Sequence, residues 1–190
     1  AEALNANRKA VELAPQDPGT HNSLGINLRD LGKLQEAKAS LRQAIELQPG
    51  YAQAHDVLGA TLLALGRLEE AEASYREAIK LNPHVSEFHN NLGNLLKNSF
   101  QLEKAEVCYR EAIKLAPTDP EANNNLGVTL QELDRLEESE EKLKKAITLK
   151  PDFPSLYNNL ANTVKSRQRL EEAVRSYNKA INLDPDFVEA

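Results

Sequence analysis

The stretch AQAHDVLGATLLALGRLEEAEASYREAIKLNPHV, residues 52–85, carries the signals of two amphipathic helices joined by a tight turn. Leu58 and Leu62 recur at the i, i+4 spacing of a buried helix face, which predicts a first helix that reaches about Leu65. Gly66 then supplies a left-handed residue to end this helix. The second helix is predicted to stop at Pro83, because proline cannot continue the hydrogen-bond ladder. Its predicted apolar face consists of Ala71, Tyr75, Ala78, Ile79 and Leu81.

The same unit recurs along the chain with a period of 34 residues. The spacing is shown by Pro15, Pro49, Pro83, Pro117, Pro151 and Pro185, and by Gly25, Gly59, Gly93 and Gly127. We interpret the chain as one array with full repeats at 18–51, 52–85, 86–119, 120–153 and 154–187. Residues 1–17 are interpreted as the second helix of a preceding repeat, and 188–190 as the start of a further one.

Two local features have a structural meaning that can be checked. Gly59 lies inside a predicted helix, where glycine costs about 1 kcal/mol relative to alanine, so we expect it to permit a close approach of another helix. Asp17 and Asp119 each precede a proline and are predicted to cap a helix, with the proline in its first position.

With these signals in place, the unit resembles a tetratricopeptide repeat. The pattern of that family is matched by His55, Leu58-Gly59, Leu62, Ala71, Tyr75, Ala78 and Pro83. The resemblance implies an all-α fold, an α-solenoid of antiparallel helix pairs that forms a right-handed superhelix. It also implies the binding of proteins or peptides, since the family shares an architecture and not a chemistry. We therefore expect a non-enzymatic protein–protein interaction module that binds a protein or an extended peptide in its concave groove.

Three positions depart from the pattern. Phe100 stands in the turn position that Gly66 fills in the second repeat, so we expect Asn98 or Ser99 to provide any left-handed residue there. Ser139 replaces the usual small apolar alanine, and Ala161 replaces the glycine. These changes affect local geometry and leave the predicted fold unchanged.

Composition bears on the class of function. A net charge of -6 and only 5% aromatic residues argue against nucleic-acid binding, which normally uses a basic surface with stacking rings. No apolar run approaches the ~18 residues of a membrane span, so no membrane partner is expected. The single cysteine, Cys108, excludes an intrachain disulfide framework and favours the cytoplasm, although a targeting signal upstream of this sequence would be compatible with it.

The sequence offers no catalytic or metal site. His21, His55 and His89 share one repeat position that the family fills with a bulky aromatic, and neighbouring packed helices lie ~10 Å apart, so we interpret them as packing residues. In RLEESEEKLKK, 135–145, Glu138, Glu140 and Glu141 each precede a lysine by four residues, which is typical of an exposed, solvated helix face. No phosphate-binding loop or Cys/His cluster is present, so no cofactor and no enzyme activity are expected.

Asparagines mark the predicted binding surface. The segment HNNLGNLLKN, 89–98, has four of them in a predicted helix, although asparagine has low helix propensity. By resemblance, the first helix of each repeat lines the groove. Its exposed stripe holds Asn91, Asn94 and Asn98 in the third repeat, Asn125 in the fourth, Asn159 and Asn162 in the fifth, and the apolar Val57 and Ala60 in the second. We expect amides at one end of the groove and an apolar patch at the other.

Two known kinds of groove are compared with this stripe. Arrays that clamp the acidic tails of chaperones place lysine and arginine at positions that here hold Asn22, Asp56, Asn90, Asn124 and Asn158, so a carboxylate clamp is not expected. The arrays of O-linked N-acetylglucosamine transferases look similar, with an asparagine ladder that Asn91, Asn125 and Asn159 match and that Ser23 and Val57 interrupt. An amide can donate to and accept from a peptide backbone of any sequence. The alternative is that the amides bond only to neighbouring helices or water.

Other functions remain open at the level of sequence. The chain could be the substrate-recruiting arm of a larger enzyme, such as a glycosyltransferase or sulfotransferase. It could also be a scaffold that self-associates end to end, because neither end has an obviously polar capping helix. A nucleic-acid solenoid is disfavoured by the acidic charge.

Overall fold

The helices reproduce the period of the sequence. The computed structural model describes residues 2–186, and within them it has eleven α-helices and no β-strand. They are α1 (Glu2–Leu13), α2 (Pro18–Asp30), α3 (Leu34–Leu47), α4 (Ala52–Ala64), α5 (Leu68–Leu81), α6 (Ser86–Asn98), α7 (Leu102–Leu115), α8 (Pro120–Glu132), α9 (Leu136–Leu149), α10 (Pro154–Ser166) and α11 (Leu170–Leu183). From α4 on, each helix begins 34 residues after its counterpart in the preceding repeat. The predicted all-α solenoid of helix pairs is confirmed, and 188–190 lie outside the described residues.

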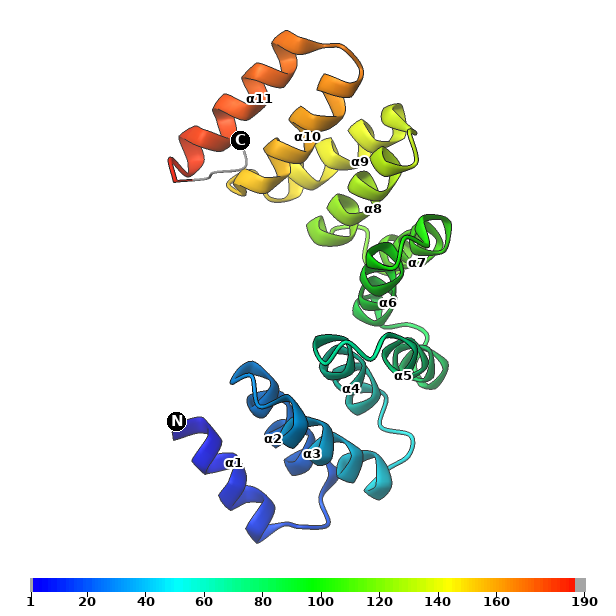
Figure 1. Cartoon of the computed structure of the whole chain (residues 1–190), viewed down its shortest axis with the longest axis vertical. Coiled ribbons are helices and arrows are strands. Elements are labelled where there is room, and N and C mark those ends of the chain that lie inside the picture. The colour runs from blue at the N-terminus through cyan, green and yellow to red at the C-terminus, as the bar shows by residue number, and fades with distance from the viewer. Residues whose placement is uncertain (1, 187–190) are drawn as a thin grey trace. The chain divides into compact units, whose positions relative to one another are not determined.

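The chain divides into two compact units, Ala1–Leu95 and Leu96–Ala190, with the boundary inside α6. In unit 1, α2 packs on α3 and α4 packs on α5 as helix pairs, and α3 also packs on α4 (Figure 1). In unit 2, α8 packs on α9 and α10 packs on α11 in the same way, with α9 against α10. Each unit therefore stacks its pairs in sequence order, and each repeat covers the apolar face of its neighbour.

Aspartate caps begin two of the first helices as predicted. The Asp17 side chain accepts a hydrogen bond from the backbone N–H of Gly19 at 3.0 Å, and Asp119 accepts one from Glu121 at 2.9 Å. The proline that follows each aspartate occupies the first turn of its helix, where a missing N–H costs nothing. Both expectations about these caps are confirmed.

Glycine permits the close contact within a helix pair. A Cβ atom added to Gly59 would lie 2.8 Å from the ring of Tyr75, and one added to Gly127 would lie 2.7 Å from Cγ of Leu143. The expected close approach is therefore confirmed. Where Ala161 stands in the glycine position, Tyr177 is only half-buried, and its hydroxyl donates to Oδ1 of Asn162 at 2.6 Å.

The turn of the third repeat corrects an expectation. Phe100 itself is left-handed, with φ 57°, and neither Asn98 nor Ser99 takes this role. The turn makes the same backbone hydrogen bonds as in the first repeat, from Gln101 N to Leu96 O and from Lys33 N to Leu28 O. Because this pattern closes the helix end, the position is left-handed whichever residue fills it.

We expect Phe100→Gly to raise the free energy of unfolding by about 0.5–1 kcal/mol. The left-handed conformation costs an L-residue about 1–2 kcal/mol, and part of this gain is offset by the greater freedom of glycine in the unfolded chain. The Phe100 side chain is 88% exposed, so its removal costs little packing. Urea denaturation followed by circular dichroism measures the change. Phe100→Ala retains Cβ and is expected to give no gain; an equal gain would assign the effect to the ring and not to the backbone.

Candidate binding pocket

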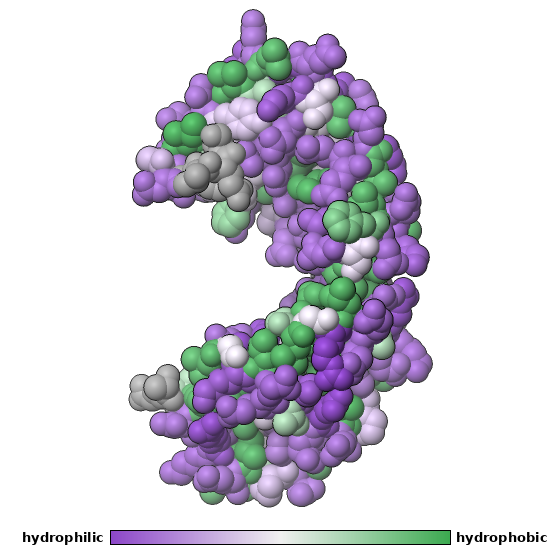
Figure 2. All heavy atoms as spheres, in the orientation of Figure 1, coloured by the Kyte–Doolittle hydropathy of each residue, from purple (hydrophilic) through white to green (hydrophobic). Residues whose placement is uncertain are grey.

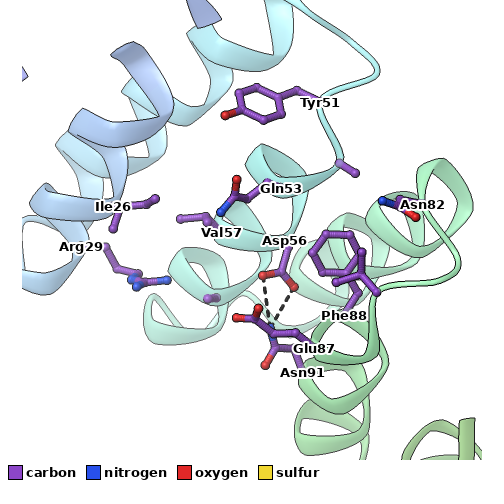
Figure 3. Close-up of a pocket in the computed structure, with 13 residues that line it drawn as sticks. Ile26, Arg29, Tyr51, Gln53, Asp56, Val57, Asn82, Glu87, Phe88 and Asn91 are labelled. Carbon is purple, nitrogen blue, oxygen red and sulfur yellow. Dashed lines mark hydrogen bonds between the residues drawn. The ribbon is translucent and has the colours of Figure 1, made fainter. Parts of the chain in front are cut away.

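A pocket of about 620 Å³ lies within unit 1, between the first helices of the first three repeats (Figure 3). Its walls come from α2, α4 and the start of α6, and its rim from the segments that precede α4 and α6. The lining residues are Ile26, Arg29, Tyr51, Ala52, Gln53, Asp56, Val57, Ala60, Asn82, Val85, Glu87, Phe88 and Asn91. Three residues of the predicted surface, Val57, Ala60 and Asn91, are thus brought together here.

One wall of the pocket is apolar. Val57 and Ala60 stand on one stripe of α4, and Ile26 faces them from α2. Figure 2 shows apolar side chains gathered over α2 and α4 of unit 1, in a surface that is otherwise mostly hydrophilic. The pocket therefore offers a surface on which an aliphatic side chain could be buried.

The opposite part of the pocket carries a buried carboxylate. Asp56 is 6% exposed, and both of its oxygens accept from Nδ2 of Asn91, at 2.9 and 3.2 Å. The Glu87 carboxylate lies beside it in Figure 3. Arg29 lines the same pocket, but its guanidinium is paired with Asp30 at 3.0 Å. Among the residues that the structure describes, Asp56 forms no ion pair.

These surroundings make Asp56 a weak acid. The pKa of Asp56 is raised to about 6, chiefly by burial and in smaller part by the neighbouring negative charge of Glu87. The hydrogen bond from Asn91 and the positive charge of Arg29 act in the opposite direction, but they do not compensate. Asp56 is thus mostly ionised at neutral pH, and the groups around it compensate little of the cost of burying its negative charge.

The asparagines also link consecutive repeats. We call the fifth and sixth residues of each repeat the amide ladder: Asn22-Ser23, Asp56-Val57, Asn90-Asn91, Asn124-Asn125 and Asn158-Asn159. In unit 1, the sixth residue Asn91 donates to the fifth residue Asp56 of the preceding repeat. In unit 2, Nδ2 of Asn159 donates to Oδ1 of Asn124 at 2.8 Å. The two partners are 35 residues apart in both cases.

Two buried oxygens lack a partner within the described residues, Oδ1 of Asn22 and Oδ1 of Asn158, and the ladder explains the first of them. The residue 35 positions after Asn22 is Val57, whose side chain has no donor. Asn22 is only 3% exposed, so its side-chain oxygen is hidden from water as well.

The other predicted surface residues are distributed over both units. Asn90 and Asn158 are buried, each 5% exposed; Asn94, Asn124, Asn125, Asn159 and Asn162 are half-buried, and Asn98 is exposed. In unit 2, Asn124 lines a smaller hollow with Lys150 and Phe153. Asn91 and Asn159 use Nδ2 between repeats, which leaves the side-chain oxygen as the atom that could meet a ligand.

The histidines have a structural role. Nε2 of His21, His55 and His89 hydrogen-bonds to the carbonyl of the proline six residues earlier, at 2.9–3.0 Å. Tyr157 holds the same position and its hydroxyl donates to Pro151 O at 2.9 Å. The interpretation of these residues as packing residues is supported, and the described residues contain no group of three or more His, Cys, Asp or Glu side chains that could hold a metal ion.

Within residues 2–186, no helix is both long and apolar enough to cross a membrane.

Sequence reasoning missed the charged part of the pocket. From the sequence, Asp56 is notable only as a position that lacks a basic residue. In the structure it lines the same pocket as Glu87 from the next repeat and Arg29 from the preceding one, and both charges act on it. One signal was available: Asp56 is the single acidic residue at a ladder position that holds asparagine in the other four repeats. The rim residues Tyr51, Asn82 and Val85 lie in inter-repeat segments, and helix periodicity does not report on them.

Several solved structures have a similar fold. The chain is 23% identical to YrrB, described as a TPR protein with an unusual peptide-binding site, with a TM-score of 0.77 over 98% of this chain and 96% of that one. PilF of Pseudomonas aeruginosa is 23% identical, with a TM-score of 0.81 over 87% and 75% of the two chains. MamA (41-end) of Desulfovibrio magneticus RS-1 is 19% identical, with a TM-score of 0.80 over 90% and 97%. A comparison with curated proteins finds no match.

Family models give the relationship at the level of sequence. Models described as tetratricopeptide repeat match residues 22–86 and 57–98, 86–119 and 108–141, and one described as TPR repeat matches 162–190. Together they cover more than half of the chain, and none of them indicates a catalytic family. The helix pairs, the 34-residue period and these matches agree, and the chain belongs to the tetratricopeptide repeat family.

Proposed function

We propose that the chain is a protein-interaction module and that the pocket of unit 1 holds part of an extended peptide or a protein segment. The observation that carries the proposal is the pocket itself, of about 620 Å³, where an apolar wall meets a few polar groups. Specific sites commonly combine a mostly apolar surface with a small number of polar groups that orient the ligand. The membership of the repeat family, whose architecture serves protein interactions, supports this reading.

The amides suggest how a peptide of varied sequence would be held. Asn91 has its donor engaged by Asp56 and lines the pocket, so its side-chain oxygen can accept from a backbone N–H. Val57 and Ala60 would contact the side chains of the same segment. Backbone hydrogen bonds supply affinity in such recognition, and side-chain pockets supply specificity.

We expect Ala60→Gln to weaken peptide binding by about tenfold or more, because the longer side chain fills space in the pocket that a ligand needs. Ala60 is half-buried on α4, and glutamine is a good helix former, so the helix should persist. Peptides are first selected from a display library on the unmodified chain. Their dissociation constants are then measured by fluorescence anisotropy on both proteins.

Ala64→Gln provides the matched control. Ala64 is exposed, lies one turn later on the same helix and does not line the pocket. Its replacement should leave the dissociation constants unchanged. Peptides that bind Ala60→Gln as tightly as the unmodified chain would contradict the pocket as the binding site, and failure to select any peptide would contradict peptide binding itself.

A further inference from the structure

The negative charge of Asp56 is not needed to hold the repeats together. Asn91 donates one amide group to Asp56, and an asparagine oxygen can accept the same bond, as Asn124 does from Asn159. Four of the five repeats have asparagine at this position. A carboxylate that is 6% exposed and lacks an ion pair is costly, and nothing in the packing of the described residues requires it.

The two carboxylates of the pocket are also poorly supplied with hydrogen-bond donors. The Asp56 oxygens share a single amide donor, and the Glu87 carboxylate stands next to them. Arg29, the basic residue of the lining, is engaged by Asp30. A complementary ligand group would therefore bring both positive charge and several donors.

A guanidinium group has these properties. It carries five N–H donors in a fixed plane, remains charged at all relevant pH values and is less strongly hydrated than an ammonium group. Its three methylene groups can lie on apolar surface while the charged end reaches a carboxylate. In this pocket the apolar surface is Val57, Ala60 and Ile26, and the carboxylates are Asp56 and Glu87.

Resting on the proposed peptide-binding function, we propose that the pocket of unit 1 takes an arginine side chain of the bound peptide. The guanidinium lies between the carboxylates of Asp56 and Glu87, and the methylene groups lie on Val57 and Ile26. The ligand class is therefore an extended peptide with one arginine at the position that meets α4.

Bound arginine should change the titration of Asp56. The charged groups around it are Glu87 on α6 and Arg29 on α2, with the Tyr75 hydroxyl on α5. A guanidinium beside Asp56 favours the ionised carboxylate, so binding should lower the pKa of Asp56 from about 6. By linkage, arginine should bind more weakly as the pH falls below about 6, because the neutral carboxyl attracts it less.

The test uses N-acetyl-arginine amide and its neutral analogue N-acetyl-citrulline amide as probes, added to the folded chain and followed by NMR. The arginine probe should shift the backbone amide signals of Val57, Ala60 and Asn91 in a saturable manner. The citrulline probe should bind about tenfold or more weakly, since hydrogen bonds to charged groups contribute more than those to neutral ones.

Asp56→Asn is the decisive variant. It retains an acceptor for Asn91 and should weaken the arginine probe by about tenfold or more. Glu69→Gln is the charge-matched control, because Glu69 is exposed in the same unit and lies outside the pocket lining. Urea denaturation of Asp56→Asn checks the fold: the variant should be at least as stable at pH 7, and its advantage should shrink as the pH falls from about 6 to about 4.

The outcomes separate this inference from peptide binding itself. No saturable shift with the arginine probe, or equal binding of arginine and citrulline, would overturn it. Selected peptides that lose affinity for Ala60→Gln, but bind Asp56→Asn normally and tolerate replacement of arginine by citrulline, would overturn it and leave the proposed function intact. Saturable binding of the arginine probe that Asp56→Asn abolishes would support the site even if no peptide were selected.

Discussion

Leu143→Ala is expected to lower the free energy of unfolding by about 2–5 kcal/mol, the range of large-to-small changes in a closed core. Leu143 is fully buried on α9 and belongs to a core cluster with Leu160, Val164 and Ala173. Removal of its isobutyl group leaves a cavity between the fourth and fifth repeats that a rigid helix pair cannot close. Urea denaturation followed by circular dichroism measures the loss. Leu170→Ala, at a position that is 63% exposed, should change stability by less than about 0.5 kcal/mol.

The cavity left by Leu143→Ala should also reduce the stability cost of a substitution at Gly127. In the unmodified chain, a Cβ at Gly127 would lie 2.7 Å from Cγ and 2.9 Å from Cδ2 of Leu143, so Gly127→Ala should cost about 1–3 kcal/mol by overpacking. In the Leu143→Ala background, those two atoms are absent. The double variant should therefore be more stable than the sum of the single changes predicts, by about 0.5 kcal/mol or more. Additive costs would contradict the packing of Leu143 against Gly127.

Glu140→Gln is expected to lower the free energy of unfolding by about 1–3 kcal/mol at pH 7, because it removes charge-assisted hydrogen bonds from a nearly buried carboxylate. The Glu140 side chain is 7% exposed, and its oxygens lie 2.6 Å from Nζ of Lys144 and 2.6 Å from Nη1 of Arg169. Arg167 also pairs with it. The carboxylate thus ties α9 of the fourth repeat to the turn before α11 of the fifth.

The effect of this substitution should depend on pH. Burial alone would raise the pKa of Glu140, but the hydrogen bonds and charges of Lys144 and Arg169 outweigh burial and lower the pKa below the ordinary value of a glutamate. A lowered pKa in the folded state stabilises the protein above pH 4.5, and this contribution is lost as the pH falls below that value. The difference between the unmodified chain and Glu140→Gln, measured in urea, should therefore be larger at pH 7 than at pH 3.

Glu141 provides the control for this experiment. Its side chain is 70% exposed and pairs with Lys142, so Glu141→Gln should change stability by less than about 0.5 kcal/mol at either pH. An equal loss for Glu140→Gln at pH 3 and pH 7 would mean that the shape of the side chain, and not its charge, holds the two repeats together.

The glutamates of α9 show which contacts cannot be predicted from the sequence. The i, i+4 pattern correctly pairs Glu140 with Lys144, yet it describes Glu140 as part of a solvated face, whereas the next repeat buries it. Glu138 pairs with Arg135 and Arg110 in place of the predicted lysine. Spacing within one helix indicates which residues are neighbours on that helix. It carries no information on which residues of the next repeat will cover them.

In the candidate site, too, some residues could be selected from the sequence and others only from the structure. Val57, Ala60 and Asn91 could be selected from the sequence because each lies on the exposed stripe of a first helix. Asp56 and Glu87 could not be joined in this way, because their proximity depends on the packing of α4 against α6. The 35-residue offset between ladder partners likewise arises from the stacking of consecutive repeats and not from the 34-residue period alone.

The repeat length, the helix boundaries and the aspartate caps follow from residues close together in the chain, because caps, breakers and helical periodicity act over a few residues. Left-handed Phe100 shows that the hydrogen bonds that close a helix end impose the backbone angle on whichever residue is there, even where its own preference differs. The unpaired charge of Asp56, the burial of Glu140 and the pocket on α4 required the tertiary structure, since each depends on side chains that different repeats bring into contact.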